Sequence, residues 1–180
     1  MNRTILALCL SIIFTFLLNP AAPLAETGTR IKEGAQNTPE TVVWFSEPRE
    51  ITDIRLLLQN GKKQEALTKA RDYVDKLKGV PGAEAQVRRY FGLNALCATL
   101  TSTGELKEAI ASCTQAIDIF PTRWQALNNR GVAHLLSNKL DLAQQDFTLA
   151  LKQVQDSEPL SDLIQHNITL VETKRSGAGQ

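Results

Sequence analysis

The sequence predicts an all-α protein, an α-solenoid in which helix–turn–helix repeats stack side by side and a final helix caps the stack. Three observations predict this fold. Residues 90–123 and 124–157 align with each other at an offset of 34 residues, with apolar and small side chains at matching positions. Gly104 and Asn138 fall at the same point of the two units, and both residue types tolerate the left-handed conformation that ends a helix. After 157, apolar residues again follow the helical period.

The N-terminus has the features of a secretory signal peptide. Arg3 precedes a mostly apolar run of 14 residues, 5–18, which is short for a membrane-spanning helix. Asn19-Pro20 ends the run, and small residues follow. We expect residues 1–25 to be removed by cleavage after Ala25, with Ala22 as the alternative site, and the protein to be exported to a periplasm or secreted. An uncleaved anchor and a buried core helix are the other readings of this segment.

Composition argues against nucleic acid and membrane as partners. The formal net charge is +1, and removing 1–25 takes away Arg3 and leaves 19 basic and 19 acidic residues. Such a balance provides little counterion release on phosphates, so we expect no nucleic-acid partner. The sequence has no apolar stretch of 18 residues, so we expect no membrane insertion after signal cleavage.

Residues 26–46 are predicted to form a flexible leader, because 26–40 are polar and lack an apolar period. Trp44 and Phe45 end a short apolar segment, which we expect to cover the open end of the domain; a docking segment is the alternative. Ser46-Glu47-Pro48 is typical of a helix N-cap with proline in the first turn.

The repeated units resemble the tetratricopeptide repeat (TPR), a 34-residue helix–turn–helix unit with small residues at positions 8, 20 and 27. The residues that carry the resemblance are Gly131, Ala143, Phe147 and Ala150 in the unit 124–157, and Ala109, Ala116 and Pro121 in the unit 90–123. Small side chains at positions 8, 20 and 27 allow the two helices of a hairpin to approach closely. Trp124 at position 1 and Gln155 in place of a proline depart from the pattern.

The resemblance extends with less support to 47–175. The unit 47–80 is a divergent first repeat, with Tyr73 at the small position 27. Nine additional residues between the turns at Gly61 and Gly104 predict a longer connection or a longer helix in the second unit. A capping helix is predicted at 159–174, and 176–180 is predicted to be a disordered tail. The inward-facing set of the capping helix is predicted to be Leu160, Leu163, Ile164, Ile168 and Val171.

Residues that could support catalysis or bind a metal are sparse. His134 and His166 are the only histidines, and neither has a partner at ligand spacing. We expect His134 to be semi-buried and hydrogen-bonded. Phosphate loops, nucleophile elbows and zinc-protease helices are absent from the sequence. We therefore expect neither enzymatic activity, nor a cofactor, nor a metal site.

The resemblance implies a scaffold that binds a partner protein or an extended peptide. In such repeats the first helix of each unit lines a concave groove through positions 2, 5, 9 and 12. In this sequence those positions are Phe91, Asn94, Ala98, Thr101, Gln125, Asn128, Val132 and Leu135. The set contains no Lys or Arg, so we expect the ligand to be an internal or weakly charged segment. A binder with a peptide groove is expected to be a monomer. A structural or assembly subunit docked permanently into a larger envelope complex is the alternative function.

The resemblance also places Cys97 and Cys113 at inward positions 8 and 24 of one hairpin. Cys97 lies about as far before the turn as Cys113 lies after it, which puts the two level on antiparallel helices. For an exported chain we predict a disulfide between them. Two separate buried thiols are the alternative.

Overall fold

The computed structural model describes residues 29–31, 43–45, 47–154 and 156–177, and it divides the chain into two units, Met1–Ser46 and Glu47–Gln180. In the first unit, β1 (Thr29–Ile31) pairs antiparallel with β2 (Val43–Phe45). The sequence predicted a flexible leader over 26–46, and the two short strands lie within that segment; both are rich in β-branched and aromatic residues. The predicted signal peptide, 1–25, lies outside the described residues.

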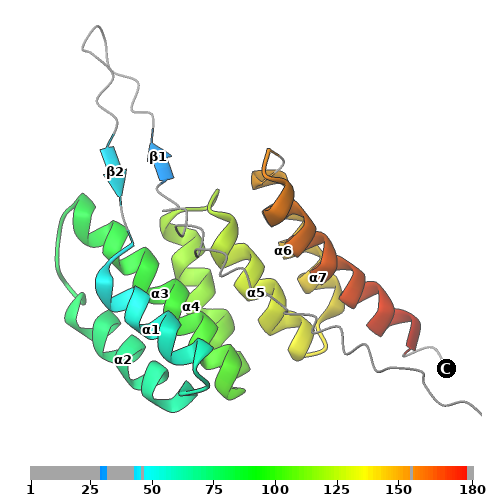
Figure 1. Cartoon of the computed structure of the whole chain (residues 1–180), viewed down its shortest axis with the longest axis horizontal. Helices are drawn as coiled ribbons and strands as arrows, with labels where there is room; N and C mark the ends of the chain where they lie inside the picture. Colours follow the sequence, from blue (N-terminus) through cyan, green and yellow to red (C-terminus); the bar gives the residue numbers. More distant parts are fainter. Residues whose placement is uncertain (1–28, 32–42, 46, 155, 178–180) are drawn as a thin grey trace, which may run out of the picture. The chain divides into compact units, whose positions relative to one another are not determined.

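The second unit consists of three helical hairpins followed by a single helix (Figure 1). The hairpins pair α1 with α2, α3 with α4 and α5 with α6, and the odd-numbered helices also contact one another in sequence, ending with α7 on α5. The helices are α1 (Arg49–Gln59), α2 (Lys63–Lys76), α3 (Ala83–Thr103), α4 (Leu106–Ile119), α5 (Trp124–Leu136), α6 (Leu140–Gln153) and α7 (Glu158–Gly177). No helix in the described part of the chain is both long and apolar enough to cross a membrane.

The turns behave as the sequence predicts. Gly104 caps α3 with φ 88°, and Asn138, after α5, has φ 59°. Both residues adopt the left-handed conformation, which glycine and asparagine tolerate best. The nine additional residues of the second unit lengthen α3, which has 21 residues against 13 in α5. Arg89 of α3 donates to the carbonyls of Leu77 and Val80, both at 3.0 Å, and so fixes the connection after α2.

Both ends of the helical unit differ slightly from the predicted boundaries. Pro48, predicted to lie in the first turn, is the N-cap of α1, and its carbonyl accepts the Ile51 amide at 2.9 Å. At the other end α7 continues through Ser176 to Gly177, so the first two residues of the predicted tail are helical.

Small residues bring the helices of each hairpin close together. Ala109, Ala116, Ala143 and Ala150 are fully buried. Gly131 lies under the ring of Phe147: a Cβ atom at Gly131 would be 2.6 Å from Phe147 Cε1. This approach is too close for any side chain, which explains why position 8 of the third unit is glycine.

Candidate binding groove

Two side-chain hydrogen bonds fix the register of α3 against α5. Asn129 Nδ2 donates to Asn94 Oδ1 at 3.0 Å, and Tyr90 Oη donates to Gln125 Oε1 at 3.3 Å. Each bond joins residues 35 positions apart in the sequence. Two bonds with the same separation show that the helices run parallel, as the first helices of stacked repeats must.

A second pair of bonds fixes α5 against α7 in the same way. Asn167 Nδ2 donates to Asn128 Oδ1 at 2.8 Å, and Lys174 Nζ donates to the Leu135 carbonyl at 3.0 Å. Both contacts span 39 residues. The helices α3, α5 and α7 therefore form one parallel row whose common face is the candidate groove.

The eight sequence-predicted groove residues all lie on α3 and α5, but their exposure differs. Six are half-buried: Phe91, Asn94, Ala98, Thr101, Gln125 and Val132. Asn128 and Leu135 are buried, each with 9% exposure, so they contribute more to the contact with α7 than to the open surface. Their role in binding a partner stays a prediction.

The two asparagines of the predicted groove are not simply solvated amides. The side-chain oxygens of Asn94 and Asn128 each accept a hydrogen bond from the next helix of the row. The Thr101 hydroxyl donates to the Cys97 carbonyl at 2.8 Å. Some polar groups of the predicted groove are therefore already hydrogen-bonded to other residues of the chain. None of the eight groove residues carries a charge.

Arg123, just before α5, forms a cluster that sequence reasoning missed. Its guanidinium carbon lies 4.9 Å from the ring centroid of Tyr90, 5.5 Å from that of Phe91 and 4.9 Å from that of Phe120. Arg123 is 7% exposed, and burial lowers the pKa of its guanidinium. Contacts with three aromatic faces offset part of the cost of desolvating this charge. The cluster joins α3 to the turn that precedes α5.

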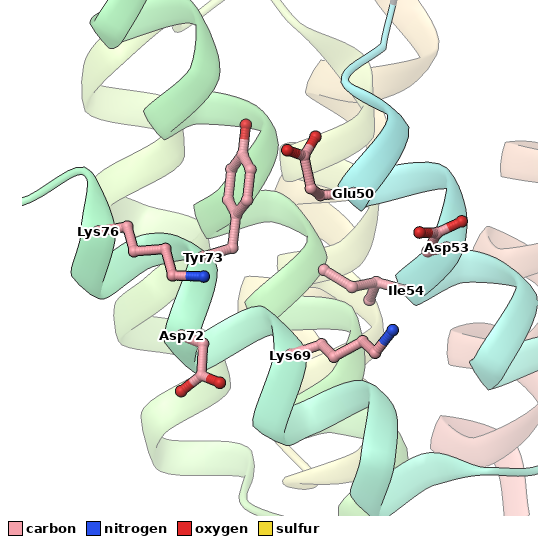
Figure 2. Close-up of a pocket in the computed structure, with 7 residues that line it drawn as sticks. All are labelled: Glu50, Asp53, Ile54, Lys69, Asp72, Tyr73 and Lys76. Atoms are coloured by element: carbon pink, nitrogen blue, oxygen red, sulfur yellow. The ribbon is translucent and has the colours of Figure 1, made fainter.

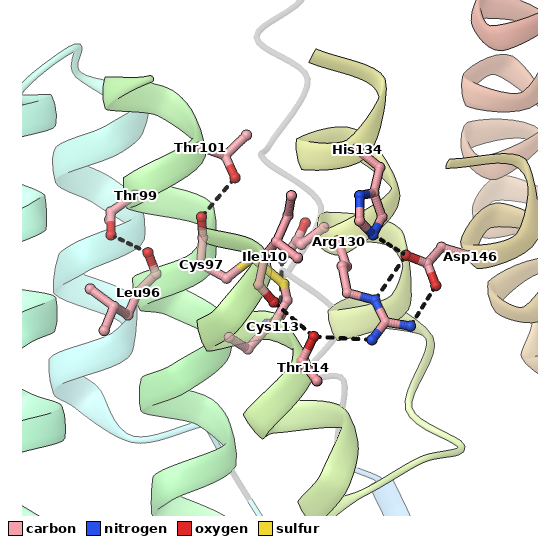
Figure 3. Close-up of a disulfide and its surroundings, with 12 residues drawn as sticks. Leu96, Cys97, Thr99, Thr101, Ile110, Cys113, Thr114, Arg130, His134 and Asp146 are labelled. Carbon is pink, nitrogen blue, oxygen red and sulfur yellow. Dashed lines mark hydrogen bonds and ion pairs between the residues drawn. A yellow bond between two sulfur atoms is a disulfide. The ribbon is translucent and has the colours of Figure 1, made fainter. Parts of the chain in front are cut away.

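A charged network links the second and third hairpins (Figure 3). Arg130 donates to both carboxylate oxygens of Asp146, at 2.9 and 2.7 Å, and to the Thr114 hydroxyl at 3.1 Å. His134 is buried with Nε2 3.8 Å from Asp146 Oδ2, and burial lowers the pKa of its imidazole. Sequence reasoning predicted a semi-buried, hydrogen-bonded His134. The residue is buried, but Nδ1 has no hydrogen-bond partner among the described residues and Nε2 contacts Asp146 only at 3.8 Å. The sequence analysis did not identify Asp146, which is buried on α6 near Ala143 and Ala150 in the sequence.

The structure joins Cys97 and Cys113 by a disulfide within the α3–α4 hairpin, with Cα atoms 5.3 Å apart (Figure 3). Both residues are fully buried. They occupy the positions that Gly131 and Phe147 hold in the next hairpin. A covalent bond in one repeat therefore takes the place of a ring packed on glycine in the next.

A cleft of about 210 Å³ opens between α1 and α2 (Figure 2). It is lined by Glu50, Asp53, Ile54, Lys69, Asp72, Tyr73 and Lys76. The Tyr73 hydroxyl is buried without a hydrogen-bond partner, and burial together with the Glu50 charge raises its pKa. Carboxylates on α1 and ammonium groups on α2 give the cleft both signs of charge. In the described part of the chain, no group of three His, Cys, Asp or Glu side chains is arranged to hold a metal ion.

Comparison with solved structures settles the fold. The TPR domain of P58(IPK) superimposes with a TM-score of 0.54 and 21% identity, covering 70% of this chain and 34% of that one. The second TPR domain of human RPAP3, solved in complex with the HSP70 peptide SGPTIEEVD, gives a TM-score of 0.51 and 19% identity, covering 68% and 92%. The fold is a TPR-type α-solenoid.

Sequence comparison gives a match over about half of the chain. The chain is 36% identical over 95 residues to the DnaJ protein P58IPK homolog A of Oryza sativa subsp. japonica. This match spans 52% of the chain but only 19% of the rice protein. No family model matches the sequence. The TPR solenoid is thus established by its three-dimensional likeness.

Proposed function

We propose that this TPR solenoid is a non-catalytic interaction module that binds an uncharged or weakly charged internal segment of a partner protein. One observation carries the proposal. The six half-buried groove side chains on α3 and α5 are all apolar or neutral amides and hydroxyls, and hydrogen bonds hold α3, α5 and α7 in one parallel row. Such a face offers hydrogen bonds and apolar contact but no charge to neutralise.

Peptide binding by the same fold supports the proposal. The RPAP3 domain is solved with the peptide SGPTIEEVD, which carries three acidic residues. The eight predicted groove residues of the present chain include no Lys or Arg, which would pair with the acidic residues of such a ligand. We therefore propose a shared mode of binding with a different ligand chemistry.

We also propose that the module works outside the cytoplasm, in a periplasm or as a secreted protein. The signal-like residues 1–25 motivate this, and a buried disulfide between Cys97 and Cys113 suits an oxidising compartment. N-terminal sequencing of the native protein tests it: a mature chain that begins near Glu26 is expected, and an intact Met1 in a membrane pellet would contradict it.

A structural or assembly subunit of an envelope complex is the alternative. A subunit of that kind co-purifies with one partner in fixed stoichiometry and resists washing, whereas a peptide-binding module stays monomeric and binds saturably. Sedimentation of the purified native protein separates the two functions.

The binding proposal is tested by filling the groove with one large side chain. Ala98 is half-buried on α3, and Ala111 is exposed on α4 of the same hairpin. Partner capture from the native envelope fraction should be lost with Ala98→Arg and kept with Ala111→Arg. Thermal unfolding of both variants controls for folding. Unchanged capture by a folded Ala98→Arg protein would exclude the groove as the binding site.

A further inference from the structure

We propose that α7 forms one side of the binding groove, where Leu163 and Leu170 contact apolar side chains of an uncharged partner segment. The proposal rests on the proposed function and specifies its ligand. It assigns a binding role to a helix that the sequence predicted to be only a cap.

The hydrogen-bond register gives α7 the position of a fourth first helix. Asn94, at position 5 of its unit, bonds to Asn129, at position 6 of the next unit. Asn128, again at position 5, bonds in the same way to Asn167, which therefore corresponds to position 6. Counting from Asn167 places Leu163 at position 2 and Leu170 at position 9. These are the positions that line the groove on α3 and α5.

Exposure agrees with this register. Leu163 and Leu170 are 46% and 43% exposed, although the sequence pattern counted Leu163 among the inward-facing residues. The face of α7 that a second helix of its own unit would cover is polar and exposed; its residues are Asp162, Gln165, Thr169 and Glu172. Polar side chains therefore cover the face of α7 on which a further helix would pack. Leu163 and Leu170 do not belong to that face.

The charges around the groove determine the kind of partner. Every Lys and Arg of α3, α5 and α7 is hydrogen-bonded to the chain itself: Arg88 to Glu84, Arg89 to two loop carbonyls, Arg130 to Asp146, Lys174 to the Leu135 carbonyl and Arg175 to Asp141. An acidic ligand would have to displace these contacts to reach any of these cations. Arg123, just before α5, is 7% exposed and stacked on three aromatic rings, so it too is covered by the chain itself. An uncharged segment with leucine-like side chains displaces none of these hydrogen bonds, and it buries the exposed apolar surface of the two α7 leucines.

The test measures binding of three fluorescein-labelled peptides to the full chain by fluorescence anisotropy. The first is a terminally blocked peptide of serine and leucine, the second has every leucine replaced by serine, and the third is SGPTIEEVD, the peptide bound by the RPAP3 domain. We expect saturable binding of the leucine peptide and much weaker binding of the other two. Preference for SGPTIEEVD, or no binding of the leucine peptide, would overturn the proposal.

The chain offers a matched control for the two leucines. Leu142 and Leu149 on α6 have the same spacing and nearly the same exposure, 43% and 45%. Leu163→Ser with Leu170→Ser should weaken binding of the leucine peptide by about tenfold or more, because apolar burial is lost. Leu142→Ser with Leu149→Ser should leave it within about twofold. Thermal unfolding checks that both double variants remain folded.

The Ala98→Arg variant separates this inference from the proposed function. If Ala98→Arg abolishes binding of the leucine peptide and the Leu163→Ser, Leu170→Ser variant binds it unchanged, the groove is the binding site and the role of α7 is refuted. If neither change affects binding, the peptide binds elsewhere and both the groove and its α7 wall are refuted.

Discussion

The Asn167 side-chain amide donates a 2.8 Å hydrogen bond to the amide oxygen of Asn128, and this bond repeats the contact between Asn129 and Asn94 one hairpin earlier. The same residue pair thus joins successive first helices twice along the stack. Because the Asn128–Asn167 contact lies between a buried residue and a half-buried one, little water competes with it. The repeat of the bond indicates that α7 docks as a further repeat helix in a defined register.

Loss of this bond should destabilise the solenoid measurably. Asn167→Ala removes the donor and leaves the Asn128 oxygen without its partner, which should lower the free energy of unfolding by about 1 kcal/mol or somewhat more. Urea unfolding followed by circular dichroism measures the change. Gln165→Ala, at an exposed position of the same helix, is the control and should be nearly neutral. Equal midpoints for the two variants would show that the amide pair contributes nothing.

The packing of Phe147 on Gly131 makes a sharper stability prediction. Gly131→Ala places a methyl group 2.6 Å from the ring edge, so the ring or α5 must shift, at a cost of about 1–3 kcal/mol. Phe147→Leu in the same chain should recover part of that loss, because a smaller side chain gives the methyl room. Gly177→Ala, where the added methyl meets no atom within 4 Å, should change little. A Gly131→Ala protein as stable as wild type would refute the close packing.

The disulfide predicts the thiol content of the native protein. Unfolded without reductant, the chain lacking 1–25 should expose no reactive thiol, since Cys97 and Cys113 are joined. Reduction should lower stability by about 3 kcal/mol, because a loop of this size no longer restricts the unfolded chain. Free-thiol titration before and after reduction gives the count. Two reactive thiols in the unreduced sample would show separate cysteines.

Because His134 is buried, we predict that the solenoid loses stability in acid. Burial lowers the pKa of His134 in the folded state, so below its ordinary value of about 6.5 the unfolded chain takes up a proton that the folded chain does not. The free energy of unfolding should therefore fall as pH drops from 6.5, by at most about 1.4 kcal/mol per pH unit for one proton. His134→Gln should flatten this part of the urea-midpoint profile between pH 7.5 and 5.5.

The second histidine supplies the comparison for that experiment. His166 is exposed on α7, so His166→Gln is the matched control and should keep the wild-type decline. A His134→Gln profile as steep as wild type would assign the acid sensitivity to carboxylates instead.

The fold was predictable because its causes are local and periodic. Small residues such as Ala109 and Ala143 recur where hairpin helices touch, and Gly104 and Asn138 end helices through their own backbone preferences. The equivalence of Cys97–Cys113 with the Gly131–Phe147 contact also follows from the period, which is why the disulfide could be predicted.

The register of α7 was not predictable in the same way. A period of 34 would pair Asn128 with residue 163, as Asn94 pairs with Asn129, whereas the hydrogen bond reaches Asn167. The segment between α6 and α7 is as long as the one between α4 and α5, so the connection does not reveal the shift. Leu163 therefore points away from the core, and only the contact itself shows this. The aromatic cluster of Arg123 was missed for a similar reason: two of its rings come from α3 and the third from the residue after α4, and the sequence does not show that they meet on one guanidinium.

The central claim, that a partner segment lies along the face of α3, α5 and α7, is tested most directly by site-specific photocrosslinking. A photoreactive residue at Gln125, half-buried on α5, should form a covalent adduct with the partner in the native envelope fraction. The same residue at Gln145, exposed on α6, should not. Adducts that map to an uncharged internal segment, from the groove position alone, are the predicted result. Adducts from Gln145 with none from Gln125 would contradict it.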